Sequence, residues 1–256
     1  MPIAFFLLMV ASRLQNRLVP QNTAPKSGNP SYDRSLALLR RGNPALKEVA
    51  LTIDDGPHVK YVPKILQVLR EDRIHATFFV VGKKVQEHPE IVREMLADGN
   101  EVGNHSMTHP RFITLKPDGV RREISGCAKA VFKATGRKMT LVRPPGLRYT
   151  DDILKIDKSM HYITVEENIA VGDFIVVGDR TWYRDSPKFA GHVATIKHNV
   201  FKQLKNGAII VLHDMPATAD ALHDIITGIH QRGYQIVTVS QMLAHLPGSG
   251  GRIPKV

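Results

Sequence analysis

Apolar residues along this chain gather in short runs that alternate with stretches of helical periodicity. Residues 49–53 form a continuous apolar run before Gly56-Pro57, which is typical of a buried strand, and residues 62–69 then place apolar side chains at helical spacing. The same alternation predicts strands at 76–81, 140–143, 162–165, 208–212 and 236–239, and helices at 89–97, 120–134, 190–204 and 219–231. Strands that alternate with helices predict an α/β fold in which helices cover a parallel sheet.

Charged and imidazole side chains recur at or just after the ends of the predicted strands. These residues are Asp54, His105, Arg143, Asp173 and His213. In a barrel of parallel strands the C-terminal ends meet on one face, where catalytic groups collect. We therefore expect a (β/α) barrel with its site on that face, although an open doubly wound sheet would also place a site at its strand ends.

The N-terminal part of the chain differs from the rest. Residues 2–11 are apolar but too few to cross a bilayer as a helix, so we expect no transmembrane span. They resemble the core of a signal peptide without preceding basic residues or a clear cleavage site, so a truncated signal peptide and a helix packed on the barrel both stay open. We expect an exported or cell-envelope protein, with a cytoplasmic location still open. The expected division is an apolar segment and linker at 1–47, a folded domain at 48–246 and a flexible tail at 247–256.

Composition and charge narrow the function classes. The chain has 256 residues, which suits one large domain, and an excess of Lys and Arg (35) over Asp and Glu (24). The basic residues are scattered among the predicted elements and form no compact stripe with aromatic residues, so we expect no nucleic-acid partner. The single cysteine, Cys127, excludes an internal disulfide and lies in phase with the apolar face of a predicted helix. The sequence does not reveal the oligomeric state.

Two adjacent carboxylates and a pair of histidines form a specific chemical pattern. Asp54 and Asp55 follow the first predicted strand. His105 and His109 have the i, i+4 spacing that puts both imidazoles on one face of a helical turn, and Pro110 stops any longer helix. One carboxylate and two imidazoles are a three-ligand set for a catalytic zinc, and the second carboxylate is then a candidate general base. A turn would account for the two adjacent aspartates taken alone, and a chance spacing would account for the two histidines taken alone. The combination of both features favours a metal site.

Four segments of the chain carry a family resemblance. They are LTIDDGP at 51–57, HSMTHP at 105–110, RPPG at 143–146 and VLHD at 211–214. In this order and spacing, the chain resembles the polysaccharide deacetylases with a NodB homology domain, the fourth family of carbohydrate esterases, over residues 48–245. The resemblance implies a distorted (β/α) barrel of about seven strands. It also implies divalent-metal hydrolysis of an N-acetyl group, usually from N-acetylglucosamine residues in chitin-like polymers or peptidoglycan.

The resemblance further implies a role for each motif residue. The implied roles are metal ligand for Asp55, His105 and His109, general base for Asp54, partner of that base for Arg143, general acid for His213 and acetyl-pocket lining for Leu212. The residue chemistry agrees, because a metal polarises an amide carbonyl and acidifies water, and imidazole titrates in the range needed to protonate a leaving amine. Zn²⁺ is expected from the ligand types, with Co²⁺ or another divalent ion as the alternative.

The third motif departs from the family pattern. The family usually has an aromatic or other side chain after the two prolines, then a glycine and later an asparagine, whereas Gly146, Leu147 and Thr150 occupy those positions here. Pro145 still fixes a rigid rim, because its ring restricts the backbone. The backbone N–H of Gly146 is retained as a candidate donor to the oxyanion of the reaction.

Two carboxylates compete for the position that orients the acid histidine. Asp173 lies in the register of the fourth motif, after Glu166 and Glu167, which stand where the family strand is usually apolar. Asp179 is the rival, three residues before Trp182 in a segment, residues 175–188, that resembles an insertion over the cleft. We expect Asp173 to be the partner, since a carboxylate beside the imidazole would keep it protonated.

These features together predict a zinc-dependent N-deacetylase of polysaccharide that contains N-acetylglucosamine. The expected partner is an N-acetylated polysaccharide or oligosaccharide. An amidase on a non-sugar C–N bond stays open because the third and fourth motifs are altered. A non-catalytic carbohydrate-binding relative also stays open, but loss of a ligand, base or acid would favour it, and the chain keeps them all.

Overall fold

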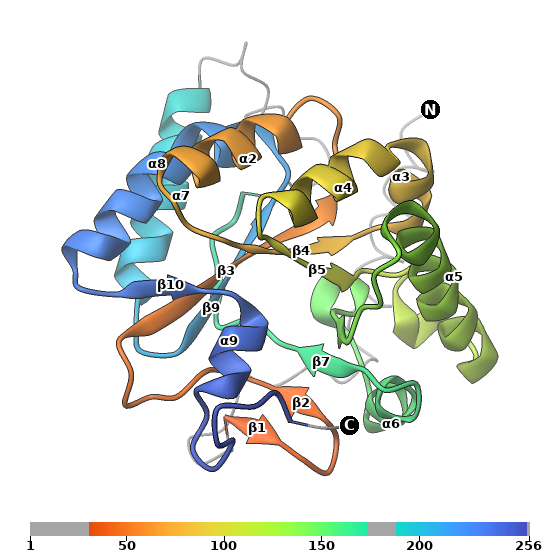
Figure 1. The fold of residues 1–256 in the computed structure, drawn as a ribbon. Coiled ribbons are helices and arrows are strands. Elements are labelled where there is room, and N and C mark those ends of the chain that lie inside the picture. The colour runs from red at the N-terminus through yellow and green to blue at the C-terminus, as the bar shows by residue number, and fades with distance from the viewer. Residues whose placement is uncertain (1–30, 174–187, 255–256) are drawn as a thin grey trace, which may run out of the picture.

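The computed structural model describes residues 31–173 and 188–254, in which helices surround one curled sheet (Figure 1). The strands are β1 (Tyr32–Asp33), β2 (Leu38–Leu39), β3 (Glu48–Gly56), β4 (Thr77–Val80), β5 (Glu101–Asn104), β6 (Leu141–Val142), β7 (Ile163–Val165), β8 (Ile169–Ala170), β9 (Ala208–His213) and β10 (Gln235–Val237). The sheet runs in the order β1-β2-β7-β6-β5-β4-β3-β9-β8, and β10 also pairs with β3. The pairs from β2 through β8 are parallel, and β1 pairs antiparallel with β2.

Helices follow most of the parallel strands, and most of these helices lie against the outer face of the sheet (Figure 1). They are α2 (Val62–Glu71), α3 (Gly82–Glu87), α4 (Pro89–Ala97), α5 (Pro117–Thr135), α6 (Asp151–Ser159), α7 (Phe189–Gln203), α8 (Pro216–Gln231) and α9 (Val239–Ala244), with short 3-10 turns at η1 (Phe112–Thr114) and η2 (Pro145–Leu147). Among the described residues, none of these helices combines the length and apolar character that a membrane crossing needs.

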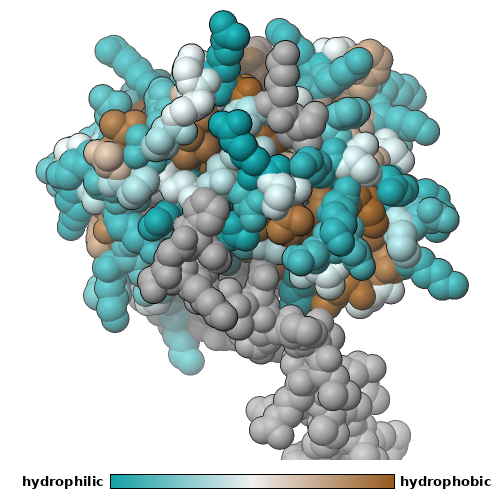
Figure 2. All heavy atoms as spheres, turned by 90° about the horizontal axis from the view of Figure 1, so that it is seen from below, coloured by the Kyte–Doolittle hydropathy of each residue, from teal (hydrophilic) through white to brown (hydrophobic). Residues whose placement is uncertain are grey.

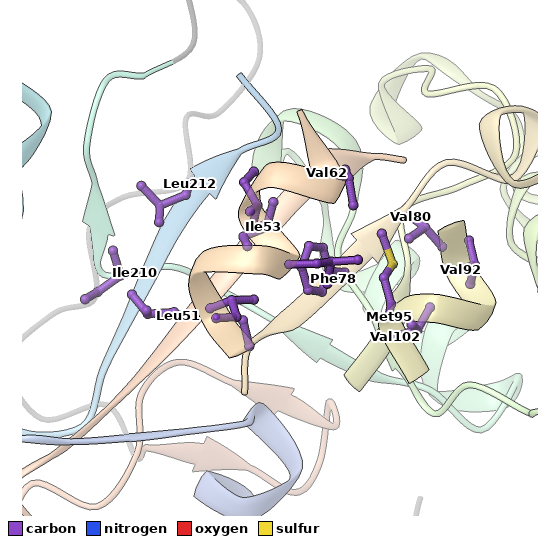
Figure 3. Close-up of a cluster of buried hydrophobic side chains, with 14 of the residues drawn as sticks. Leu51, Ile53, Val62, Phe78, Val80, Val92, Met95, Val102, Ile210 and Leu212 are labelled. Carbon is purple, nitrogen blue, oxygen red and sulfur yellow. The ribbon is translucent and has the colours of Figure 1, made fainter. Parts of the chain in front are cut away.

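The alternation of side chains along β3 explains why the sheet has two different faces. Leu51 and Ile53 belong to the large apolar cluster between the sheet and the helices, together with Phe78 of β4 (Figure 3). Ala50 belongs to a second cluster on the inner face. Because strand side chains alternate between faces, Asp54 lies on the same inner face as Ala50, at the C-terminal end of the strand.

Helix α9 fills one end of the interior. Its Met242 and Leu243 pack with Ala50 and Phe79 in the inner cluster. The N-terminal residues of α9 bind the start of β4, where the Val239 N–H donates to Thr77 Oγ1 at 3.0 Å. The N-terminal ends of the strands are thus closed by apolar packing, which leaves the C-terminal ends for a polar site.

The architecture confirms the expected fold, a distorted barrel of strands surrounded by helices. One part differs from the expectation of a linker before residue 48. Residues 31–47 include β1 and β2, and Leu38 pairs in parallel with Thr164 of β7. These strands were not expected because each spans only two residues, too few for a periodic pattern. The expected division at 47/48 and 246/247 stays a prediction.

Candidate active site

The C-terminal end of β3 presents two consecutive carboxylates to one site. The pairing of β3 with β4 shifts register between Asp54 and Gly56, so Asp55 is an extra, bulged residue. Asp55 has a φ of 73°, a left-handed conformation that Asp adopts more readily than most residues. Lys84 of α3 donates from Nζ to the Asp55 carbonyl at 2.7 Å, which anchors the bulge. The bulge breaks the strict alternation of strand side chains and so lets neighbouring residues serve the same site.

Arg143, at the end of β6, is fully buried and bound to Asp54. Its Nη1 donates to Asp54 Oδ1 and to Thr52 Oγ1, each at 2.7 Å. Its Nε and Nη2 donate to the backbone carbonyls of Val165 and Glu166. A buried charge needs such partners, and the guanidinium compensates the negative charge of Asp54 inside the barrel.

Asp55, His105 and His109 bring three metal-binding atoms together. Asp55 Oδ1 lies 3.4 Å from His105 Nε2 and 3.0 Å from His109 Nε2. Together these ligand atoms lie within 4.8 Å of one another. Burial alone would raise the pKa of Asp55, but the two imidazoles beside it hold that pKa well below its usual range. The carboxylate is therefore ionised and ready to bind a cation.

The chemistry of these donors fits a divalent cation. His105 Nδ1 lies 2.7 Å from the carbonyl oxygen of Arg143, and because a carbonyl only accepts, Nδ1 carries the proton and Nε2 presents its lone pair. Asp55 Oδ1 is buried without a hydrogen-bond donor among the described residues. A carboxylate oxygen with two imidazole nitrogens is a ligand set typical of catalytic zinc.

The loop that carries the histidines is not the helical turn that we expected. Residues 105–111 contain no helix, and Ser106 and His109 have φ values of 68° and 63°. The Ser106 N–H donates to Asn104 Oδ1, and the His109 N–H donates to Ser106 Oγ. Side chains therefore replace the backbone bonds of a helix. The prediction of a helical turn was wrong because two left-handed residues also bring positions i and i+4 to one side.

His213 ends β9 opposite Asp54 in the register of the sheet. Its Nδ1 lies 2.9 Å from Asp173 Oδ1, while Thr218 Oγ1 donates to Asp173 Oδ2 at 2.7 Å. Burial works against a charged ring, but the hydrogen bond with Asp173 raises the pKa of His213 to about 9. The rival carboxylate, Asp179, lies outside the described residues.

The predicted pocket residues are only partly brought together. Pro145 and Gly146 follow Arg143 in η2, where Gly146 has a φ of 67° and open space around the position of a Cβ. Leu212, however, is fully buried in the cluster between the sheet and the helices (Figure 3), so it does not line the pocket. Its neighbour Val211 shares a face of β9 with His213, because side chains alternate along the strand. The expectation for Leu212 was wrong because Leu212 lies on the opposite face of β9 from His213.

Sequence reasoning missed several residues that support the site. Thr52 binds Arg143, and its position two residues before Asp54 on an alternating strand was the signal for it. Glu166 accepts from the Tyr149 hydroxyl, and its other carboxylate oxygen lies 3.9 Å from Arg40 Nε. Burial raises the pKa of Glu166 to about 7. The presence of this carboxylate in a strand expected to be apolar was the signal for this cluster. Trp182, expected near the cleft, lies outside the described residues.

Comparisons with known proteins agree with this geometry. The polysaccharide deacetylase family model matches residues 41–165. The chain is 36% identical over 204 residues to the peptidoglycan-N-acetylmuramic acid deacetylase PdaC of Bacillus subtilis, which covers 78% of this chain and 39% of that protein. It is 33% identical over 204 residues to a peptidoglycan-N-acetylglucosamine deacetylase of Bacillus cereus, covering 78% of this chain and 89% of the relative.

Similarity extends to solved structures. The peptidoglycan N-acetylglucosamine deacetylase Bc1960, in complex with a naphthalenyl-N-oxidanyl-benzamide, superimposes with a TM-score of 0.73 at 27% identity, over 84% of this chain and 96% of that one. The chain spans well under half the length of PdaC but most of the Bacillus cereus relative. The four motifs, the curled sheet and these similarities lead to one conclusion. The chain belongs to the polysaccharide deacetylase family.

Proposed function

We propose that this protein removes N-acetyl groups from N-acetylglucosamine residues of a glycan, either peptidoglycan or a chitin-like oligomer. One observation carries the proposal. The ligand cluster around Asp55, the Arg143-bound Asp54 and the Asp173-bound His213 meet at the C-terminal ends of the strands. Two relatives named as peptidoglycan deacetylases, one for muramic acid and one for glucosamine, support the substrate class.

Asp55, His105 and His109 are the residues that would hold a divalent cation. We propose Zn²⁺, with Co²⁺ as the alternative, because imidazole and carboxylate suit both ions. When bound, the cation supplies positive charge that polarises the acetyl carbonyl and lowers the pKa of water. Three protein ligands leave room for water and substrate.

Asp54 is the general base in this proposal. Arg143 engages its Oδ1, while Oδ2 lies 3.9 Å from His105 Nε2 and so faces the ligand cluster. Oδ2 accepts the proton of the attacking water. Because Arg143 is itself fixed by buried partners, Asp54 stays in one orientation during the transfer, and a positioned base of this kind contributes roughly 10²–10⁴-fold to the rate.

His213 is the general acid. With a pKa of about 9, its imidazole is protonated at neutral pH. Asp173 holds Nδ1, so the proton passes from Nε2 to the sugar nitrogen as the C–N bond breaks. An amine leaves far more readily than an amide anion, which is why the reaction needs this acid.

The backbone around the two prolines completes the site. We propose that the Gly146 N–H donates to the oxyanion of the tetrahedral intermediate and that Pro145 keeps the turn rigid. Val211, on the same face of β9 as His213, takes the acetyl-lining role that we had expected of Leu212. Residues 48–246 are proposed as the catalytic domain, in an exported or cell-envelope protein, because such glycans lie outside the cytoplasm.

The test is acetate release from N-acetylglucosamine oligomers and from peptidoglycan. We expect acetate from Zn²⁺-loaded protein, none after a chelator and a rate lower by roughly 10²–10⁴-fold for Asp54→Asn, since the base is lost. Asp152→Asn is the matched control, because this carboxylate lies on the surface with its side chain 85% exposed. Its rate should equal that of the unchanged protein.

Two results would overturn the proposal in different ways. If neither glycan releases acetate although the protein binds one metal ion per chain, either the substrate is a non-sugar amide or the protein only binds the glycan, and a panel of non-sugar amides separates the two. If Asp54→Asn retains full activity, the assignment of the base is wrong. Comparison of the two glycans also ranks glucosamine against muramic acid as the residue deacetylated.

A further inference from the structure

Glu123 of α5 forms hydrogen bonds with the loop that carries His105 and His109. Its Oε2 accepts from the N–H groups of Met107 and Thr108 at 2.9 and 2.8 Å, and its Oε1 accepts from Thr108 Oγ1 at 2.9 Å. One carboxylate thus satisfies three donors of a loop of five residues, 105–109. Carboxylate hydrogen bonds of this type are among the stronger ones in proteins, because the acceptor is charged.

The loop backbone is also bound by α3. The N–H groups of Gly82 and Lys83, at the start of that helix, donate to the carbonyls of Ser106 and Met107 at 2.9 Å each. The Met107 side chain packs closely on two glycines. A Cβ added to Gly82 would lie 2.6 Å from the Met107 sulfur, and a Cβ added to Gly126 of α5 would lie 3.1 Å from Met107 Cβ. The loop is therefore held by both α3 and α5, which also pack against each other.

The two histidines are held in different ways. The His105 side chain is only 3% exposed, and its Nδ1 is fixed by the Arg143 carbonyl. The His109 side chain is 43% exposed, so packing confines it far less. Its direction depends on the backbone, which has left-handed φ values at Ser106 and His109. Such conformations persist only where surrounding contacts enforce them, and Glu123 supplies the contacts at the two residues between.

We propose that Glu123 is a positioning residue that holds His109 in the metal-binding geometry before the cation binds. This inference rests on the metal binding proposed above. Removal of Glu123 leaves two backbone donors of the loop without an acceptor, so the loop samples conformations in which His109 points away from Asp55. Supporting contacts behind metal ligands typically contribute 10–100-fold to affinity, and we expect that loss here.

The test measures Zn²⁺ affinity directly, by competition with a chromogenic chelator, in the full-length protein. Glu123→Ala should weaken binding about 10–100-fold. Glu123→Gln should weaken it less, because its amide oxygen still accepts from the backbone. The control is Asp118→Ala, an exposed carboxylate on the same helix, which should bind Zn²⁺ like the unchanged protein. At saturating Zn²⁺, kcat of both Glu123 variants should approach the unchanged value.

A second readout separates positioning from simple loss of stability. In the metal-free protein, hydrogen exchange of the Met107 and Thr108 amides should accelerate in the variants while amides in β3 and β9 keep their rates. Equal Zn²⁺ affinity in the unchanged protein and both Glu123 variants would overturn the inference. Failure of the unchanged protein to bind Zn²⁺ would instead overturn the proposed function. If Glu123→Ala fails to fold, Glu123→Gln decides the question alone.

Discussion

Asp173 helps to set the protonation state of His213, the proposed catalytic acid. Its two carboxylate oxygens are fully used, one by His213 Nδ1 and the other by the His213 N–H and the Thr218 hydroxyl. These contacts fix the carboxylate so that it opposes the burial of the ring, which on its own would lower the pKa of His213. The hydrogen bond and the charge of Asp173, with the charges of Asp54 and Asp55, therefore keep the proton on His213 at neutral pH.

The first prediction concerns Asp173→Asn. Without the negative charge of Asp173, burial is less opposed and the pKa of His213 falls from about 9, although the charges of Asp54 and Asp55 still raise it. The alkaline limb of the kcat/KM pH profile should move to lower pH, and activity at neutral pH should drop. The variant should also lose stability that the pair gives below pH 6.5 and that disappears as the pH rises through about 9. An unmoved alkaline limb would contradict the role of Asp173.

At the residue scale, the sequence predicted which residues form the ligand set better than it predicted the backbone geometry and the direction in which each side chain points. The spacing of Asp55, His105 and His109 identified the ligand set, which the structure brings together. The backbone that does so was not readable, because the bulge at Asp55 and the left-handed loop residues depend on tertiary contacts. The same limit explains the misplacement of Leu212. The family motif indicates a strand end, but only the register of the strand decides which side chain faces the site.

Among the elements, α6 shows what periodicity overlooked. This helix was not expected, although the sequence carries two ordinary signals of a helix start. Thr150 caps the helix by accepting the Ile153 N–H, and Asp151 and Asp152 lie in its first turn. On its inner face Asp157 is fully buried. Its Oδ2 accepts from Thr164 Oγ1 at 2.8 Å, but Oδ1 has no hydrogen-bond partner among the described residues.

Asp157→Asn should stabilise the protein in a pH-dependent way. Burial raises the pKa of Asp157 to about 7 from 3.8, although Thr164 partly offsets this. Between these values the folded state binds more protons than the unfolded state, so stability falls as the pH rises and the penalty is complete above about 7. Asparagine keeps the bond to Thr164 without the charge. The variant should therefore melt at a higher temperature than the unchanged protein at pH 8, with a smaller difference at pH 4. Equal differences at both pH values would show that the charge is not the cause.

Across the whole molecule, the alternation of strands and helices and the parallel sheet followed from the sequence, whereas the strands at the edge of the sheet did not. Strands of six to nine residues such as β9 and β3 have strong apolar runs. The two-residue strands β1 and β2 lie at the edge of the sheet, where β2 pairs with β7 and β1 pairs with β2. Arg40, directly after β2, then reaches Glu166 beside the guanidinium of Arg143. The N-terminal strands therefore connect to the back of the site.

Removal of β1 and β2 should weaken both stability and activity. A chain that begins at residue 47 exposes the edge of β7 and loses the Arg40 contact with Glu166. Exposed strand edges promote aggregation, so we expect a lower melting temperature and more aggregate than in a chain that begins at residue 31. Both should be measured by thermal unfolding and light scattering, with acetate release from the soluble fraction. Equal behaviour of the two chains would place residues 31–46 outside the functional domain.

Because β3 pairs with β9, the residues proposed for catalysis come together only when these two strands, distant in the sequence, have met. Thr52 donates to the Ile210 carbonyl across 158 positions of sequence, and the same pairing sets Asp54 beside His213. Contacts between residues so far apart in the sequence form slowly, because the chain loses the entropy of closing a long loop before the contact contributes any stability. A growing chain contains the three proposed metal ligands by residue 109 but gains the proposed acid only with residue 213. Glu123 and the Arg143 carbonyl hold the loop and ring that present these ligands, so the ligand cluster needs the chain up to residue 143, and the proposed acid joins it only when the two distant strands meet.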